Sequence, residues 1–433
     1  MENKILEKAK MFYFLVLAIM MYYFINEYID LGLFVTYRHA FALGLAVSAV
    51  VMFLYKPNIA RGFTAFTDAC VYSIPLLVIT VASMFVWFME TVDVDVMSRG
   101  LSSSFIYTNM LSFALAAGAM LYIFGGKGIW YNLVAILIAN ILMILTIIAE
   151  HGLGNYMSEF ITLVTTFADV TGDIIVQAEI HELAFCLGAY LIYMLYKPKK
   201  NVVYFILLFL SIFCFLSAFK RIAIIAIAAA LAFGYLLKFI EKYNKKTAGN
   251  LVIIFTIIVI TLLIGYVALI KMDVFKLLED AGINTSGRVG IYNAVDDFYE
   301  FNPGFLGNGI GFVTYQLNSF INIGVAAIHN DFLQYYIDLG FWGYIIWLVA
   351  ISLIRVLYFG RKGNVENAII TFMLTIYLVI VSSTDNTMSY PLLTGTLAIL
   401  MMGNDFDENV RNKELKMFGY ISPVNKEESD LFL

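Results

Sequence analysis

Apolar residues along this chain gather in long runs that are separated by polar or charged segments. Runs of about 20 apolar residues are long enough for a helix to cross the hydrocarbon core of a bilayer. The pattern therefore predicts an all-α, polytopic membrane protein with about 12 transmembrane helices. The predicted spans lie near residues 11–29, 33–55, 64–89, 103–124, 129–149, 182–196, 202–219, 222–239, 250–270, 338–358, 366–384 and 388–403.

Composition agrees with lipid as the main solvent. Hydrophobic residues make up 61% of the 433 residues, and charged residues make up 14%. Soluble domains contain about 45–50% apolar and about 25% charged residues. The segments between the runs are too short to form a separate soluble domain. We therefore expect one transmembrane domain over residues 1–403 and a tail over residues 404–433.

The placement of basic residues predicts the orientation, because Lys and Arg gather on the cytoplasmic side of a membrane. With the N-terminus in the cytoplasm, twenty of the 27 Lys and Arg residues lie on the inner side and seven on the outer side. Both termini are thus predicted to be cytoplasmic, and the polar tail to be mostly disordered. Two long loops then lie outside the cytoplasm, at about 150–181 and, between spans 9 and 10, at about 271–337. Within the first loop, residues 161–168 favour an interfacial helix.

Motifs for metals and nucleotides are missing from the sequence. The three cysteines lie inside apolar runs and form no CxxC pattern. His181 and Glu182 are adjacent but lack the HExxH spacing. The acidic residues Glu90, Asp93 and Asp95 are interpreted as a solvated turn. We therefore predict no bound metal, no cofactor and no nucleic-acid partner.

Four glycines occur close together in the second long loop, at Gly304, Gly307, Gly309 and Gly311. Their spacing fits neither the dinucleotide-binding fingerprint nor a P-loop. Two interpretations stay open: a tight turn that packs against the membrane domain, and backbone contacts with a ligand.

A histidine and three cations fall on the predicted outer side. His329 precedes the tenth span, where an imidazole could accept a proton from a hydroxyl or could cap the helix. Lys220 and Arg221 separate two apolar runs, and such cations are either functional or extended toward lipid phosphates. Arg288 presents a fork suited to phosphate. Together these groups could hold a diphosphate beside a reacting hydroxyl, as transfer from a lipid pyrophosphate requires.

Several runs of this chain resemble the O-antigen polymerase and ligase family (Wzy/WaaL type). They are Pro303-Gly-Phe-Leu-Gly-Asn-Gly-Ile-Gly, His329-Asn-Asp-Phe-Leu-Gln, Asp338-Leu-Gly-Phe-Trp-Gly, the Lys220-Arg221-Ile-Ala hairpin and the Ser286-Gly-Arg288 segment. The resemblance covers roughly residues 200–360. It implies a GT-C-like membrane glycosyltransferase that uses glycans on undecaprenyl diphosphate outside the cytoplasmic membrane, without a nucleotide or an obligatory metal.

The resemblance also implies roles for individual residues. His329 is the expected catalytic group, and Arg288 and Arg221 are expected to bind phosphate. The choice between Arg221 and the adjacent Lys220 stays open. The residues predicted to contact substrate are Lys220, Asn330, Gly309 and Tyr292.

The predicted function is polymerisation of undecaprenyl-diphosphate-linked oligosaccharide repeat units of an O-antigen, capsule or exopolysaccharide. The reaction would be an inverting glycosyl transfer at the outer face of the inner (cytoplasmic) membrane. Expected partners are a lipid-linked donor and acceptor, membrane lipid, a chain-length regulator and a flippase. One alternative is an O-antigen ligase-type transferase that acts on lipid A core or protein. Another is a polysaccharide or lipid transporter or flippase, which would favour matched broken helices in two halves; the sequence shows no such symmetry.

Overall fold

A computed structural model describes most of the chain. The described residues are 7–16, 18, 37–89, 97, 111–166, 181–218, 220–282, 287–319, 328–361 and 365–419. In these residues the secondary structure is helical and contains no strand, which confirms the all-α prediction. The acidic turn at 90–95, Ser286 and much of the predicted first span fall outside the described residues.

The helices form two compact units, each built from separate stretches of the chain. The first unit contains residues 1–70, 112–235 and 391–433, and the second contains residues 71–111 and 236–390. Two helices, α3 and α12, continue from one unit into the other. The helices of the first unit are α2 (Tyr37–Tyr55), most of α3 (Ile59–Tyr72), α6 (Ser112–Phe124), η2 (Gly125–Lys127), α7 (Gly128–His151), α8 (Leu153–Thr166), α10 (His181–Tyr196), α11 (Val202–Ala218), most of α12 (Arg221–Tyr243), α20 (Pro391–Gly403) and α21 (Phe406–Phe418).

Several helices have the length and composition of membrane spans. In the described part of the chain there are five such helices, or six if α3 and α4, which are separated by a break at Ser73, form one span. The four shorter apolar helices are Ala40–Tyr55, Glu182–Tyr196, Val202–Ala218 and Pro391–Gly403. The helices thus occur where the apolar runs predict them, whereas the count of 12 spans and the orientation stay predictions.

The first long loop contains the helix α8, which begins earlier than the alternating pattern predicts. It follows α7 directly after Gly152, and its Tyr156 is buried. The Phe160 ring lies 6.0 Å from the Phe213 ring of α11, measured between centroids. Aromatic packing therefore holds one side of α8 against α11.

The prediction of a mostly disordered tail is wrong for residues 406–418, which form the helix α21. Phe406, Val410 and Glu414 recur every four residues and are buried, so one face of this charged helix packs against the first unit. Asn58 donates a hydrogen bond of 3.1 Å to the Glu414 carboxylate. Gly419 ends the helix in the left-handed conformation, a common helix stop.

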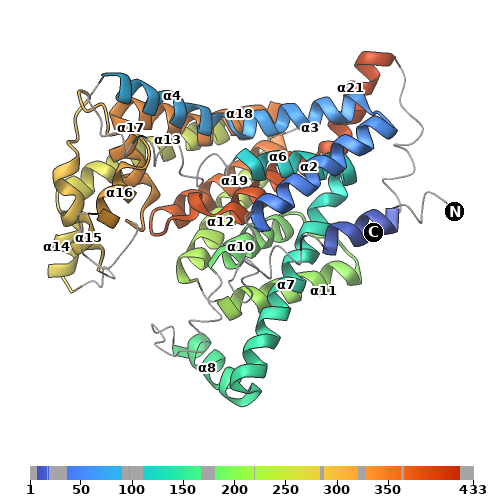
Figure 1. Cartoon of the computed structure of the whole chain (residues 1–433), viewed down its shortest axis with the longest axis horizontal. Coiled ribbons are helices and arrows are strands. Elements are labelled where there is room, and N and C mark those ends of the chain that lie inside the picture. Colours follow the sequence, from blue (N-terminus) through green and yellow to red (C-terminus); the bar gives the residue numbers. More distant parts are fainter. Residues whose placement is uncertain are drawn as a thin grey trace. The chain divides into compact units, whose positions relative to one another are not determined.

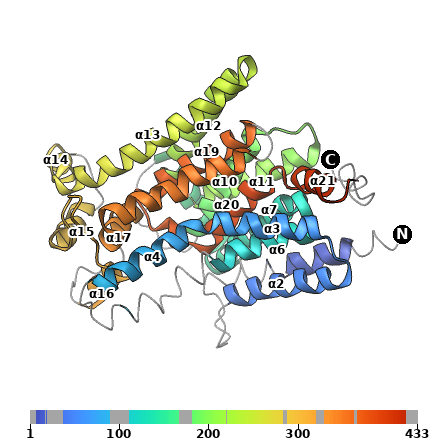
Figure 2. The ribbon, with the colours of Figure 1, turned by 90° about the horizontal axis from the view of Figure 1, so that it is seen from above.

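The second unit contains the long loop and the spans on both sides of it. Its helices are α4 (Ile74–Met89), α13 (Lys245–Lys271), α14 (Val274–Asp280), α15 (Arg288–Val295), η3 (Asp296–Phe298), α16 (Phe312–Ser319), α17 (Asp331–Leu348), η4 (Val349–Ile354), α18 (Arg355–Arg361), α19 (Val365–Ser382) and η5 (Thr387–Ser389). The short helices α14, α15 and α16 gather at one end of α13 and α17 (Figures 1 and 2). The predicted loop is therefore a folded cap on these two helices.

The glycine-rich segment packs against an interruption in α17. Gly340 has a non-helical backbone, with φ 71°, which frees the carbonyls of the preceding turn. The Asn308 and Gly309 amides donate to the Ile337 and Asp338 carbonyls at 3.1 and 2.7 Å, respectively. The Phe341 amide in turn donates to the carbonyl of residue 305 at 2.9 Å. The segment thus supplies the hydrogen bonds that a continuous helix would have made.

We expect Gly307→Ala to destabilise the protein by about 2–5 kcal/mol, because it adds left-handed strain and overpacking. Gly307 has φ 90°, and a Cβ there would lie 2.3 Å from the Gly340 backbone nitrogen. Gly290→Ala is the matched control, since nothing lies within 4 Å of its Cβ position in α15. Thermal unfolding in detergent measures both variants. An unchanged Tm for Gly307→Ala would contradict the described packing.

A buried arginine follows the π-helical turn η4 in the second unit. The Arg355 guanidinium donates to the Tyr72 carbonyl at 2.6 Å and lies 3.8 Å from the centre of the Tyr72 ring. The amide of residue 76 bonds to the Ser73 carbonyl instead of continuing the helix at Tyr72. Arg355 therefore satisfies a carbonyl left free at the break between α3 and α4.

Candidate functional site

A polar cluster in the second unit lies where α13, α15 and α17 meet the turn that follows α19. Four peptide segments converge there, and all of them contribute side chains or carbonyls to one hydrogen-bond network. The turn is a short polar run, Ser382-Ser-Thr-Asp-Asn-Thr387, between two apolar helices.

Asn330 is the centre of this network. It is fully buried and caps α17, because its side-chain oxygen accepts a hydrogen bond of 3.2 Å from the Leu333 amide. Its side-chain nitrogen donates to the hydroxyls of Tyr266 and Tyr292, at 3.1 and 3.0 Å. One amide thus joins the start of α17 to α13 and α15.

His329 precedes this cap and is exposed, unlike the buried Asn330. Its φ of 56° lies in the left-handed region, which costs a non-glycine residue about 1–2 kcal/mol. Such strained residues occur often at functional sites. The side chain is 48% exposed, and its Nδ1 lies 3.7 Å from the Asp385 Oδ1. The imidazole is therefore held near a carboxylate while it remains open to a ligand.

Asp385 is itself fixed by the turn that carries it. Its Oδ1 accepts hydrogen bonds from the Asn386 amide at 2.8 Å and the Tyr390 hydroxyl at 3.1 Å. The carboxylate is 15% exposed. These contacts hold the carboxylate where it can orient the His329 ring.

Arg288 reaches the same turn from α15. Gly287, with φ 74°, precedes the helix, and the Arg288 guanidinium donates to the Thr384 carbonyl at 2.9 Å. Arg288 and His329 therefore contact consecutive residues of one turn, whose Cα atoms are about 3.8 Å apart. This arrangement attaches a cation and a possible base to the same turn.

Tyr292 lies one turn after Arg288 on α15 and faces the network. Burial is the main cause that raises the pKa of its hydroxyl, although the Asn330 hydrogen bond and the Arg288 charge oppose the shift. The phenol therefore stays neutral at physiological pH. Its observed contacts fasten α15 to the start of α17, and its predicted contact with substrate stays a prediction.

Further bonds attach the turn to the helices around it. The Asp331 carboxylate accepts from the Met388 amide at 2.9 Å, and the Asn386 side chain donates to Gln334 at 3.1 Å. The Tyr266 hydroxyl donates to the Ser383 carbonyl at 3.0 Å. Sequence reasoning missed this turn and Asp385. The signal that could have revealed it is the run of six polar residues between apolar helices.

Lys220, Arg221 and Gly309 are the remaining predicted site residues. Lys220 and Arg221 belong to the first unit, where Arg221 begins α12 and is exposed. Gly309 packs against α4, since a Cβ there would lie 2.1 Å from the Trp87 Nε1. Among the residues that the structure describes, no three metal-ligating side chains come together.

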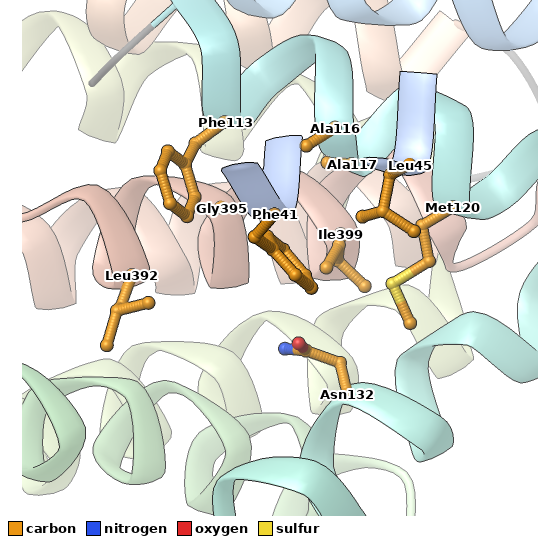
Figure 3. Close-up of a pocket in the computed structure, with 10 residues that line it drawn as sticks. All are labelled: Phe41, Leu45, Phe113, Ala116, Ala117, Met120, Asn132, Leu392, Gly395 and Ile399. Atoms are coloured by element: carbon orange, nitrogen blue, oxygen red, sulfur yellow. The ribbon is translucent and has the colours of Figure 1, made fainter. Parts of the chain in front are cut away.

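A small cavity in the first unit has a different character. Asn132 is its polar residue, and the side chain points toward it (Figure 3). This amide donates to the Tyr190 hydroxyl at 2.9 Å. The remaining lining residues are apolar: Phe41, Leu45, Phe113, Ala116, Ala117, Met120, Leu392, Gly395 and Ile399. None of the lining residues is an acid, a base or a cation, so the cavity offers no group for acid–base or phosphate chemistry.

A comparison with known protein families gives a match that includes part of the polar cluster. Residues 205–348 match a family model described as O-antigen ligase (Wzy_C). This part of the chain is similar to the O-antigen ligase family. No curated protein matches the chain.

The match confirms the family that the runs at 303–311 and 329–343 predict. The matched residues include Arg221, Arg288, Tyr292, His329 and Asn330, whereas the turn with Asp385 follows them. The apolar helices and this match together indicate a multi-pass membrane protein.

Proposed function

We propose that this protein transfers glycan from a lipid-linked donor, and that it is a polymerase of undecaprenyl-diphosphate-linked repeat units. The proposal depends on one observation above all. His329 and Arg288, both in the region that matches the O-antigen ligase family, contact consecutive residues of one turn. This reaction requires a base and a phosphate-binding cation, and both proposed groups contact the same turn.

The reaction can be written with these residues in defined roles. A sugar hydroxyl of the acceptor attacks the anomeric carbon of the donor, and the bond from that carbon to the diphosphate oxygen breaks. His329 takes the hydroxyl proton, and Arg288 stabilises the charge that grows on the departing undecaprenyl diphosphate. A single displacement inverts the anomeric centre. Arg221, or Lys220 beside it, stays a predicted second phosphate contact.

The proposed setting follows the predicted topology. The site would face the outer side of the cytoplasmic membrane, where donor and acceptor lipids are present. No nucleotide or metal is required by the proposed chemistry, because undecaprenyl diphosphate is already a good leaving group. A chain-length regulator and a flippase remain proposed partners.

Asp385→Asn is expected to reduce the transfer rate about two- to fivefold. The pair with His329 is partly exposed, and exposed ion pairs contribute about 0.2–1 kcal/mol. Asn386→Ala changes the same turn without removing the carboxylate and serves as the comparison. The measurement is kcat on purified lipid-linked repeat. A rate for Asp385→Asn equal to that of the unchanged protein would remove Asp385 from the mechanism.

The ligase alternative is equally supported by the matched family, so the acceptor must be tested directly. Purified protein is incubated with lipid-linked repeat alone, and then with lipid A core or an acceptor protein added. Polymer from the repeat alone supports the polymerase. Transfer that occurs only with the added acceptor identifies a ligase, and no transfer in either case overturns the proposed chemistry.

A further inference from the structure

A second group of cations lies in the first unit, far along the chain from the proposed catalytic residues. The loop between α10 and α11 contains Lys197 and Lys199. The Lys197 ammonium donates to the Asn404 side-chain oxygen at 3.1 Å, just after α20. The Tyr193 hydroxyl donates to the same oxygen at 3.1 Å. Lys197 is thus positioned by residues of α10 and of the segment that follows α20.

Lys199 lies over an aromatic ring. Its ammonium is 4.8 Å from the centre of the Trp130 ring on α7. Burial is the main cause that lowers the pKa of Lys199, and the charge of Lys197 lowers it further. In the part of the chain that the structure describes, no carboxylate pairs with Lys199. Two cations therefore lie close enough to repel each other, and one of them is partly removed from water.

The aromatic residues connect the two lysines. The Trp130 ring packs against Tyr193 and Tyr204, in each case with 6.3 Å between ring centroids. Tyr193 therefore contacts both Trp130, the ring under Lys199, and Asn404, the hydrogen-bond partner of Lys197. These contacts preorganise the two ammonium groups before any ligand arrives.

We propose that Lys197 and Lys199, with Trp130 beside them, bind the phosphate of an anionic phospholipid headgroup. Two adjacent cations, one of them partly removed from water, are stabilised by an anion, and a phosphodiester accepts hydrogen bonds from both ammonium groups. Inorganic phosphate offers the same chemistry. The loop joins two apolar helices, α10 and α11, whose ends lie at headgroup depth when they are embedded in a bilayer. Tryptophan is enriched at that depth, and the predicted side is cytoplasmic, where anionic lipids attract lysines.

The test compares lipid binding by the full chain and by two double variants. Native mass spectrometry counts retained phosphatidylglycerol, and thermal unfolding in detergent measures stabilisation as this lipid is added. K197Q with K199Q is expected to bind phosphatidylglycerol about 30-fold more weakly, because each lysine near a membrane surface contributes about a factor of five. K197R with K199R keeps both charges and is expected to retain binding.

Matched controls separate this site from general surface charge and from free phosphate. K242Q with K246Q removes two exposed lysines elsewhere and is expected to leave binding unchanged. Phosphatidylcholine and inorganic phosphate are expected to stabilise the full chain much less than phosphatidylglycerol. Three results would each overturn the proposal. The first is that K197Q with K199Q binds phosphatidylglycerol as tightly as the unchanged protein, and the second is that K242Q with K246Q loses as much binding as K197Q with K199Q. The third is that inorganic phosphate stabilises the protein as much as phosphatidylglycerol does. Mass spectrometry keeps the test valid if the Gln variant is less stable.

Discussion

His329→Ala is expected to abolish polymer while single repeat units remain on their lipid carrier. The imidazole is the proposed base just before α17, and its Nδ1 lies 3.7 Å from the Asp385 carboxylate. A positioned general base contributes about 10²- to 10⁴-fold to a rate. Loss of that factor would leave too few transfer events to extend a chain. The measurement combines the glycan profile of a strain that carries the variant with the rate on purified lipid-linked repeat.

Two control variants distinguish loss of the catalytic group from misfolding of the His329→Ala protein. His329→Asn removes the base but keeps a residue that tolerates the left-handed backbone, and it should be as inactive as the alanine variant. His151→Ala changes a histidine at the end of α7 and should leave polymer length unchanged. Normal polymer from His329→Ala, at normal protein levels, would end the proposed catalytic role.

Arg288→Ala is expected to lower the transfer rate about 10²- to 10³-fold. This range is typical when a donor that stabilises transition-state charge is removed. Arg288→Lys should recover part of the rate, because it keeps the charge but loses the planar fork that suits a diphosphate. Steady-state kinetics on lipid-linked repeat would place most of the loss in kcat, since the charge on the leaving group grows during bond breaking.

Lys276→Ala is the comparison for Arg288. Lys276 is an exposed cation on α14, in the same cap, and its removal should leave kcat unchanged. Equal and small decreases in kcat for Arg288→Ala and Lys276→Ala would mean that Arg288 only attracts the anionic lipid in a general way. That result would exclude stabilisation of the diphosphate by Arg288.

The sequence predicts the helical class well, because runs of apolar residues are direct markers of helices that face lipid. It predicts much less about the segments between them. The helix α21 contains only a few apolar residues, Phe406 and Val410 among them, so its buried face is hidden in a charged segment. Short helices such as α14 and α15 have too few turns to show a clear period.

The candidate site was predictable where a motif carried the signal. The family runs pointed to His329 and Arg288, and the structure brings both to one turn. Asp385 escaped notice because its importance depends on contacts across about 50 residues of sequence, which no local pattern reveals. Gly309 had two open interpretations, and its contacts with Trp87 and with the Asp338 carbonyl account for the glycine by packing. A contact of Gly309 with substrate stays a prediction.

The π-helical turn η4 is a place where the chain can lose one residue without re-registering the helix. Such a turn contains one residue more than an α-helix needs for the same advance. Deleting a single residue between 349 and 354 would therefore leave a regular helix in which Arg355 still points toward Tyr72 and the same α18 face packs on α19. A one-residue deletion in a regular part of α17 would instead rotate everything after it by about 100°, and it would do more harm than the deletion in η4.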